Sequence, residues 1–487
     1  MINPDSTADR ARRMGEGGIL RLLLSFSVPA IVGMMTNALY NVVDRIFIGR
    51  GVGALGLAGA TVGFPIMLVL MAFGMLVGMG GGALVSIRLG ENKKPEAERI
   101  LGNSLILLIA ISAVLTALGL IFLDPLLRLF GASDTILPYA REYVSIVLAG
   151  SVFMGLGFGM NNFIRAEANP RIAMATMLIG AVLNIALDPI FIFALKLGIR
   201  GAALATVLSQ AVAAAWVLSY FLGKTSSLSL RAANLKLDPG ILRRIVAIGS
   251  PPFVMQLAAS VLNAILNNQL QRYGGDLAIS AMGILYGVMM FIFMPVFGLN
   301  QGAQPIIGFN YGAGKYDRVR KTLVLAIGAA TAIMLVGFVV TRVFADAVVR
   351  LFSGDNPELI SLGTQAMRIY LAMMPVIGFQ IVSANYFQAV GKPRPAMILS
   401  LSRQVLLLIP ALLILPRFFG LLGVFLAGPT ADLGSAILTG TWLFFELRAL
   451  RAPGRQRAAR PQAGPGMPPG TAASAAETAE SESAGQD

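Results

Sequence analysis

The sequence contains no cysteine and no histidine, and charged residues make up only 13% of its 487 residues. The absence of cysteine excludes disulfide bonds and thiolate metal sites. Histidine is the usual proton relay near neutral pH, so any proton coupling in this chain must use carboxylates. A soluble globular domain carries about 25% charged residues. This chain therefore has too few charges to cover a surface that faces water.

Apolar residues account for 56% of the chain, and the mean hydropathy is +0.75. Apolar stretches long enough to cross a hydrocarbon core of about 30 Å recur along most of the sequence. We therefore expect an all-α integral membrane protein with twelve transmembrane helices. The predicted spans are residues 20–49, 56–87, 101–123, 137–163, 172–196, 201–223, 241–271, 278–310, 320–344, 360–388, 395–417 and 420–446.

Polar segments lie before, between and after these spans. Residues 1–19 form an N-terminal segment without the small-residue cleavage pattern of a signal peptide. A linker at 224–240 separates an N-terminal lobe, 20–223, from a C-terminal lobe, 241–446. The tail, 447–487, is rich in arginine and then in proline, glycine, alanine, serine and glutamate. Because this composition cannot bury a core, we expect the tail to be disordered.

The basic residues indicate how the chain is oriented. The net charge of +14 could point to nucleic acid, but the basic residues lie in short loops between apolar runs. Such loops collect on the cytoplasmic side of membrane proteins. Of the 38 lysine and arginine residues, 26 fall on one predicted side and 10 on the other, with Arg45 and Arg403 inside spans. We therefore expect both termini in the cytoplasm and no nucleic-acid partner.

The two halves of the sequence repeat one another. Residues 162–174 match residues 385–397 at an offset of 223, and Pro29 falls on Pro252 at the same offset. At an offset of 222, residues 90–93 fall on residues 312–315, and residues 128–130 on residues 350–352. Each half has six spans, an even number, so both halves share one orientation. In transporters, parallel repeats of this kind face each other across a central cavity and rock to give alternating access.

Ionisable residues inside spans are the sharpest functional signal, because a charge at mid-bilayer costs at least about 2.5–3.5 kcal/mol. Asp44 lies in the outer part of the first span, and Asp188 in the outer part of the fifth. Asn184 shares a helix face with Asp188, and Thr206 lies near the outer start of the sixth span. These groups could ligate a hard cation such as Na⁺, or the two neighbouring carboxylates could share a proton.

Structural roles remain open for the same residues. Asp44 could pair with Arg45 or Arg50 at the membrane interface, and Asp188 could make a hydrogen bond before the Pro189 kink. In the C-terminal half, Asn267 and Ala411 stand where Asp44 and Asp188 stand, so coupling is predicted to be one-sided.

Other polar side chains inside spans could pair or line a substrate cavity. We expect Arg403 and Asp432 to form a structural pair. The candidate cavity residues are Asn37, Asn41, Asn162, Gln256, Asn263, Asn267, Gln301, Gln304, Gln380 and Asn385.

No motif of a nucleotide-driven pump or an enzyme is present in the sequence. The glycine-rich segment 308–316 has the wrong spacing for a phosphate-binding loop and places Tyr316 at the Ser/Thr position. A membrane-embedded transferase would need a clustered acidic motif on a loop, and the sequence has none. We therefore expect no enzymatic activity and no cofactor beyond a coupling ion.

Several segments resemble the multidrug and toxic compound extrusion (MATE) transporters. Residues 27–33, 37–49 and 53–59 are similar to the first two spans of that family, and closest to its DinF branch, which includes the MepA-like efflux pumps. Residues 387–393 and 428–432 extend the likeness to the second half. The resemblance covers about residues 20–446 and leaves the tail out.

This resemblance implies two six-helix bundles around a V-shaped chamber, and export of cationic or amphipathic drugs driven by Na⁺ or H⁺. It implies that Asp44 is functional and that Asp44, Asn184, Asp188 and Thr206 form a cation site in the N-terminal lobe. Tyr143 corresponds to a tyrosine near that site. Branches of the family that couple through acids of the C-terminal lobe do not fit, because Asn267 and Ala411 are neutral.

We therefore expect a monomeric, multi-pass exporter in a bacterial plasma (inner) membrane, with small drug-like molecules and membrane lipid as partners. The alternative is a flippase for lipid-linked precursors, which shares the broader superfamily fold. A flippase would need a strongly basic cavity for pyrophosphate, and few cations other than Arg403 are predicted in mid-span.

Overall fold

The computed structural model describes residues 7–223, 225–353 and 356–451. Contacts divide the chain into a unit Met1–Thr441 and a second unit Trp442–Asp487. The described part of the second unit is the end of a helix, so most of the predicted tail lies outside the described residues. The predicted lobes both fall mainly in the first unit.

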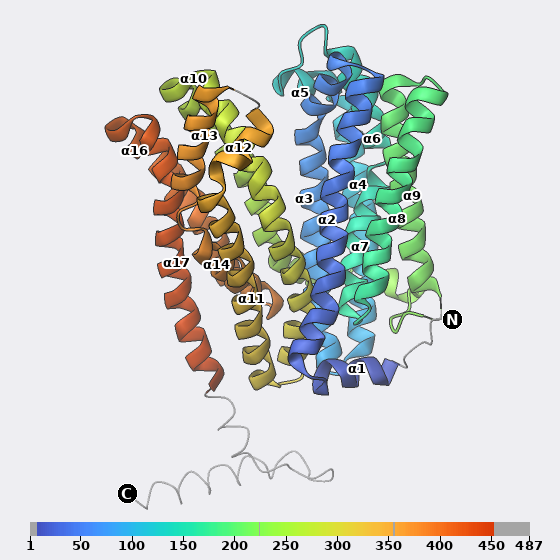
Figure 1. Cartoon of the computed structure of the whole chain (residues 1–487). Coiled ribbons are helices and arrows are strands. Elements are labelled where there is room, and N and C mark those ends of the chain that lie inside the picture. Colours follow the sequence, from blue (N-terminus) through green and yellow to red (C-terminus); the bar gives the residue numbers. More distant parts are fainter. Residues whose placement is uncertain (1–6, 224, 354–355, 452–487) are drawn as a thin grey trace, which may run out of the picture. The chain divides into compact units, whose positions relative to one another are not determined.

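Long helices make up the two repeated halves of the first unit (Figure 1). The first half contains α2 Ile19–Gly51, α3 Ala54–Gly90, α4 Lys94–Ile121, α6 Leu137–Ala149, α7 Ser151–Ala166, α8 Pro170–Pro189, the π-helix η1 Ile190–Ala194 and α9 Gly198–Leu222. The second contains α10 Pro239–Gly312, α11 Tyr316–Val343, α13 Pro357–Tyr370, α14 Met374–Ala389, α15 Pro393–Leu401, the π-helix η3 Ser402–Leu408, α16 Ile409–Phe419 and α17 Leu421–Arg451. Shorter helices are α1 Thr7–Glu16, α5 Leu123–Leu129, η2 Ala232–Leu235 and α12 Ala345–Ser353.

The twelve predicted spans can all be located. Within the described ranges, nine helices are long and apolar enough to cross a membrane. Two further spans are bent helix pairs, α6 with α7 at 53° and α13 with α14 at 50°. Helix α10 holds two predicted spans, because the backbone at Gly275 is not helical. The bends were not predicted from the apolar pattern, since each pair taken together is apolar enough to be one span.

Turns with positive φ angles recur at matching places in the two halves. This backbone conformation is uncommon for residues other than glycine, and here it marks places where helices begin or end. The pairs, each 222 or 223 residues apart, are Gly53 and Gly275, Asn92 and Gly314, Ala168 and Gly391, and Gly198 and Gly420. The duplication seen in the sequence therefore extends to the backbone of the turns.

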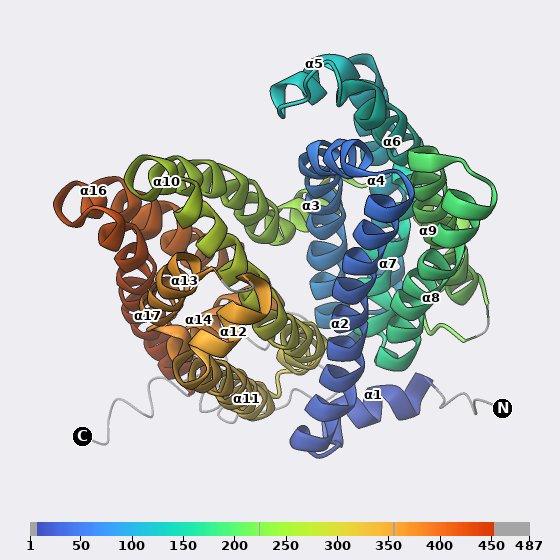
Figure 2. The same ribbon diagram turned by 45° about the horizontal axis from the view of Figure 1, so that its top comes forward.

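The two halves meet through closely packed backbones of α3 and α10. A Cβ atom added at Gly249 of α10 would overlap the carbonyl oxygen of Leu76, and one added at Gly90 of α3 would overlap that of Phe309. Gly312 approaches the carbonyl of Ile87 in the same way. Because small residues allow such approach, these contacts bring the two bundles together on the side of the basic loops. We call this side, where the loops with Lys93, Lys94 and Lys315 lie, the basic end. Figure 2 shows α3 and α10 from a second direction.

The N-terminal helix α1 lies across the direction of the long helices at the basic end (Figure 1). Arg10 donates a hydrogen bond to the carbonyl oxygen of Thr225, in the connection between α9 and α10, at 3.0 Å. The backbone oxygen of Met14 accepts from Asn310 of α10 and from Arg318 of α11, both at 3.1 Å. The Met14 side chain is buried. This short helix therefore connects the segment after α9, at the end of the first half, to α10 and α11 of the second half.

The glycine contacts yield a direct test. We expect Gly249→Ala to lower the free energy of unfolding in detergent by about 1–3 kcal/mol, because the added methyl group meets a backbone carbonyl that cannot move aside. Gly283→Ala on the same helix is the matched control, since an added Cβ there meets nothing within 4 Å. That control should be neutral, or stabilising by up to about 1 kcal/mol. Equal stability of the two variants would contradict the packing described for α3 and α10.

Candidate functional site

Helix α2 presents one face to α8 and η1. Gly33 lies against Met177 of α8, and Gly51 against Ile192 and Phe193 of η1. The ring of Phe47 also meets that of Phe193 edge to face, with centroids 6.3 Å apart. Asp44 lies one turn before Phe47 and two turns before Gly51, on the same face. The packing of α2 therefore turns the Asp44 carboxylate toward the end of α8.

The end of α8 supplies the second carboxylate. Asn184 and Asp188 are one turn apart on α8, and both are buried. Pro189 follows and has no N–H group for the helix ladder, and the chain continues as the π-helix η1. Such π-helical turns are frequent at functional sites. The carboxyl groups of Asp44 and Asp188 lie close enough for a hydrogen bond when one of them carries a proton.

Two further helices complete the cluster. The Asn184 amide nitrogen donates to Asp188 Oδ1 at 3.5 Å and to Thr206 Oγ1 of α9 at 3.3 Å. Tyr143 of α6 is buried, and its hydroxyl group is within hydrogen-bonding reach of Thr206. The structure thus brings together the four residues that the sequence placed at one depth, and adds Tyr143, which the family resemblance had pointed to. Their role in ion coupling stays a prediction.

We call Asp44, Asn184, Asp188, Thr206 and Tyr143 the acid cluster. Some of its buried oxygens have no hydrogen-bond partner among the described residues. Asp44 Oδ1, Asn184 Oδ1 and Asp188 Oδ2 are buried and accept no hydrogen bond from any described residue. An unpaired buried acceptor costs about 1–3 kcal/mol, and more when it is charged. Three such oxygens in one cluster are the donor set that a hard cation prefers, and the two carboxylates can equally take up a proton.

Tyr40 belongs to the same cluster, although no sequence pattern singled it out. It lies one turn before Asp44 on α2, within electrostatic range of both carboxyl groups. The one-turn spacing from Asp44 was the available signal. A tyrosine in an apolar span is ordinary, however, and spacing alone does not show that the ring faces Asp188.

The second half carries a different polar cluster. Arg403 lies in the π-helix η3, and its Nε donates to Asp432 Oδ1 of α17 at 2.5 Å. Gln380 donates to the backbone oxygen of Asp432. Tyr370 lies near Arg403 and packs on Gly428, the first residue of the segment 428–432. The expected pairing of Arg403 with Asp432 is therefore present in the structure.

The ten candidate cavity residues do not gather in one place. Asn162, Gln301 and Gln304 line one small cavity between α3, α7 and α10. Asn41 donates to Asn37 within α2. Gln256, Asn263 and Asn267 lie along α10, and Gln380 and Asn385 on α14, where Asn385 donates to the Asn300 carbonyl at 3.4 Å. Their role in binding substrate stays a prediction.

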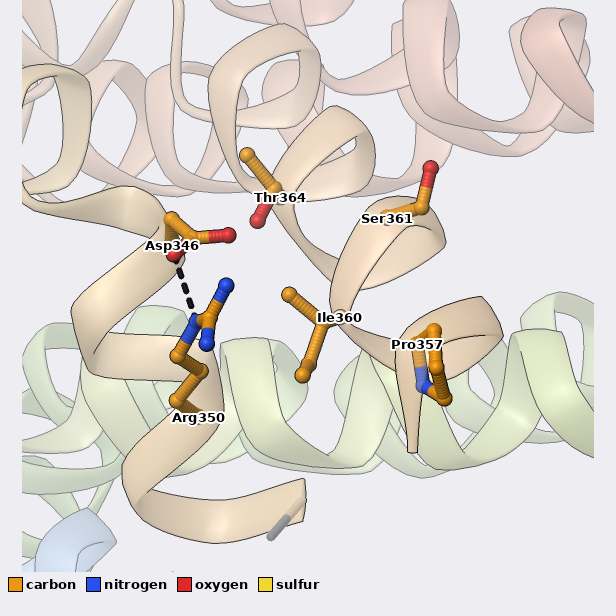
Figure 3. A pocket seen from close by; sticks show the side chains of 6 residues that line it. All are labelled: Asp346, Arg350, Pro357, Ile360, Ser361 and Thr364. Atoms are coloured by element: carbon orange, nitrogen blue, oxygen red, sulfur yellow. Dashed lines mark hydrogen bonds and ion pairs between the residues drawn. The ribbon is translucent and has the colours of Figure 1, made fainter. Parts of the chain in front are cut away.

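A larger groove lies between α12 and α13, far along the chain from the acid cluster (Figure 3). Its volume is about 440 Å³, and the exposed ion pair between Arg350 and Asp346, 2.7 Å long, forms one wall. Thr364 turns its hydroxyl group toward this groove. None of the residues predicted for coupling or substrate binding lines it.

Comparison with known proteins gives consistent matches over both halves. The family model described as MatE matches residues 29–190 and 251–413. The multidrug export protein MepA of Staphylococcus haemolyticus strain JCSC1435 is 31% identical over 409 residues, which cover 84% of this chain and 90% of MepA. MepA of Staphylococcus aureus strain N315 is 28% identical over 408 residues, covering 83% of this chain and 89% of that protein.

Solved structures match over a similar length. The MATE multidrug transporter DinF-BH, solved as a complex, is 42% identical, with a TM-score of 0.82 over 88% of this chain and 96% of that one. A MOP superfamily transporter from Pyrococcus furiosus is 26% identical, with a TM-score of 0.85 over 90% of this chain and 98% of that one. The all-α fold of two repeated six-helix bundles, predicted from the sequence, is confirmed.

The Arg403–Asp432 pair can be tested by neutralising one partner. Because Arg403 would then be left in the bilayer without its counter-charge, we expect Asp432→Asn to lower the free energy of unfolding by about 3–5 kcal/mol. Asp346→Asn is the control, because it breaks an exposed pair that contributes at most about 1 kcal/mol. Denaturant titration in detergent measures both. Similar losses in the two variants would remove the structural role of the pair.

Proposed function

This chain is a member of the MatE family, and on that basis we propose that it is a secondary antiporter that exports cationic or amphipathic drugs and toxic compounds. Export is driven by H⁺ or Na⁺ and proceeds by alternating access. The MepA proteins and DinF-BH, which are named as multidrug transporters, align with this chain over nearly their whole lengths. The acid cluster of α2, α8 and α9 is the observation that carries the proposal.

Electrostatics explain why this cluster can couple an ion to transport. Two carboxylates in a low-dielectric site repel each other strongly, so both remain ionised only when a cation lies between them. Binding of one Na⁺ or one proton removes this repulsion and draws Asp44 toward Asp188. Because Asp44 is on α2 and Asp188 on α8, occupancy changes how these two helices pack. Helix α2 also touches the second half, where Ser27 meets Gly302 of α10, so its movement reaches the junction of the two lobes.

The two candidate ions would use different parts of the cluster. A Na⁺ ion needs several oxygens, and Asn184 Oδ1 and Thr206 Oγ1 supply the neutral ones beside the carboxylates. A proton needs only Asp44 and Asp188. The neutral oxygens are therefore essential for sodium coupling and secondary for proton coupling.

The basic end is the cytoplasmic end in this proposal, and the protein resides in a bacterial plasma membrane. Short loops with lysine and arginine are retained in the cytoplasm during insertion. The acid cluster then lies toward the outer side, and the α3–α10 contacts close the cytoplasmic side. Substrate can enter from the cytoplasm only after these contacts part.

The lipid-linked precursor flippase ranks second. A pyrophosphate group needs several unpaired cations in the central cavity. Arg403, which lies inside a span, is paired with Asp432 and is not available to a phosphate. Drug export by purified protein in liposomes without lipid-linked precursor separates the two functions.

Imposed ion gradients test the coupling role of Asp44. We expect the wild-type chain in proteoliposomes to export a fluorescent cation under an inward gradient of Na⁺ or of H⁺. Asp44→Asn should reduce gradient-driven export at least about 100-fold, because the carboxylate pair loses its charge repulsion. Asp134→Asn, at an exposed residue paired with Arg128, is the control and should retain export. Normal coupled export by Asp44→Asn would sink the proposed role.

The Thr206 hydroxyl separates the two ions. If Na⁺ is the coupling ion, Thr206→Val should weaken the apparent Na⁺ affinity about tenfold, since a ligand oxygen is lost. If H⁺ is the coupling ion, the pH profile of export should stay nearly unchanged. Thr176→Val is the matched control, because this buried threonine of α8 donates only to the backbone of Ile172 among the described residues. A loss of Na⁺ affinity in that control would show a general effect of packing.

A further inference from the structure

A buried arginine near the basic end of α7 has no counter-charge. Arg165 is 5% exposed, and within the described part of the chain its hydrogen-bond partner is a neutral group, Asn162 Oδ1 at 2.9 Å. The nearby carboxylate of Glu167 is engaged elsewhere. It accepts hydrogen bonds from Tyr220, from Ser226 and from the backbone of the following two residues. Arg165 makes no ion pair with any described acid.

The repeat shows that this charge is not required by packing. At the offset of 223 residues, the counterpart of Arg165 is Gln388, which is also buried. Gln388 donates to the backbone oxygen of Ile248 at 3.3 Å. The same position of the fold is therefore filled by a neutral amide in the second half. The position of Arg165 in the last turn of α7 favours a cation through the helix dipole, but this effect is small beside the cost of burying a charge.

Arg165 lines a small cavity at the junction of the two halves. Met79, Ser86 and two glycines of α3 form one wall, and Gln301, Gln304 and Pro305 of α10 form the opposite wall. The cavity has about 10 Å³ of free space, room for a single water-sized body and too little for an organic molecule. An occupant would touch both halves at once.

The lining groups are suited to an anion. Among the residues that the structure describes, no carboxylate lines the cavity. Arg165 supplies a charged donor, and the amide nitrogens of Gln301 and Gln304 are held only by contacts of 3.5 Å, to Met34 Sδ and to the Met79 carbonyl. For the Met79 carbonyl this length is at the limit of hydrogen bonding, and the Met34 sulfur is a weak acceptor at any length. Both amides can therefore turn toward a bound anion. Turning the Gln301 amide breaks no hydrogen bond to its oxygen, because that oxygen is buried and accepts none from a described residue.

We propose that the cavity of Arg165, Gln301 and Gln304 is a binding site for a small inorganic anion, chloride being the physiological candidate, and that the bound anion holds the two halves together at the basic end. A ligand shifts a conformational equilibrium only through its different affinity for the two states. The α10 amides leave Arg165 when the halves part, so the anion binds the closed arrangement more tightly. Chloride would thereby oppose opening toward the basic end. This inference rests on the proposed alternating access, whereas the site itself does not.

Anion replacement at constant ionic strength, pH and Na⁺ tests the site. The full chain in detergent is heated in sodium gluconate with increasing sodium chloride, and its unfolding midpoint is followed. We expect a saturable rise for the wild type, and an apparent chloride affinity at least about tenfold weaker in Arg165→Gln. Arg320→Gln, which removes an exposed arginine near the same end, is the control and should respond as the wild type does. A chloride effect that survives Arg165→Gln, or no effect in the wild type, would overturn the proposal.

Two further measurements keep the test decisive if Arg165→Gln does not fold. Gln304→Met retains the volume but removes a donor, and should also weaken the chloride response.

Because the chain has no cysteine, Lys94→Cys and Lys321→Cys allow spin labels to be placed on α4 and α11, one in each half. In this labelled protein, which retains Arg165, chloride should raise the population with the shorter distance between the two labels at least about threefold. Chloride binding without this shift would remove the gating role alone, and the efflux assays with Asp44 variants decide the transport function separately.

Discussion

The hydrocarbon interior tolerates a polar group only when that group has a partner or serves a function such as binding a ligand. A charge at mid-bilayer costs at least about 2.5–3.5 kcal/mol, and the alternatives are a partner, a water-filled space or a ligand. Arg403 and Asp432 satisfy this constraint by pairing with each other. Asp44 and Asp188 do not, because two acids cannot neutralise one another without a cation. The same physical cost thus separates a structural cluster from one that calls for an ion.

The junction of the two halves has a different requirement. In the proposed alternating access, the contacts between α3 and α10 must form and must also be able to part. Glycine contacts bring the backbones of α3 and α10 close together, and the ring of Phe73 on α3 packs against that of Phe253 on α10 beside them. Helix α1 adds a few buried or partly buried hydrogen bonds, each of which contributes only about 0.5–1.5 kcal/mol. In the proposed alternating access, these contacts part each time the basic end opens.

Sequence patterns predicted the spans, the duplication and the shared depth of Asp44, Asn184, Asp188 and Thr206, because each depends on hydrophobic period or on position along a helix. Apart from the pair of Arg403 and Asp432, they did not predict which polar residues face each other. The pattern of basic loops includes Arg165, since it lies one residue from the end of α7, yet the structure buries it against α10. Gln304 looks in the sequence like any uncharged group in an apolar span, yet in the structure it reaches Met79 of α3. The direction in which a side chain points depends on how its helix is rotated and bent, and a single sequence does not specify either.

The duplicated halves have divided the charged positions between them. Asp44, Asp188 and Arg165 have the neutral counterparts Asn267, Ala411 and Gln388, while Arg403 and Asp432 of the second half correspond to Gly180 and Ser209. A change in ion occupancy therefore alters the electrostatics of the first half and leaves the paired charges of the second half as they are. In the proposed mechanism only the first half therefore responds to the coupling ion, through Asp44 of α2 and Asp188 of α8, and the second half keeps its paired charges throughout.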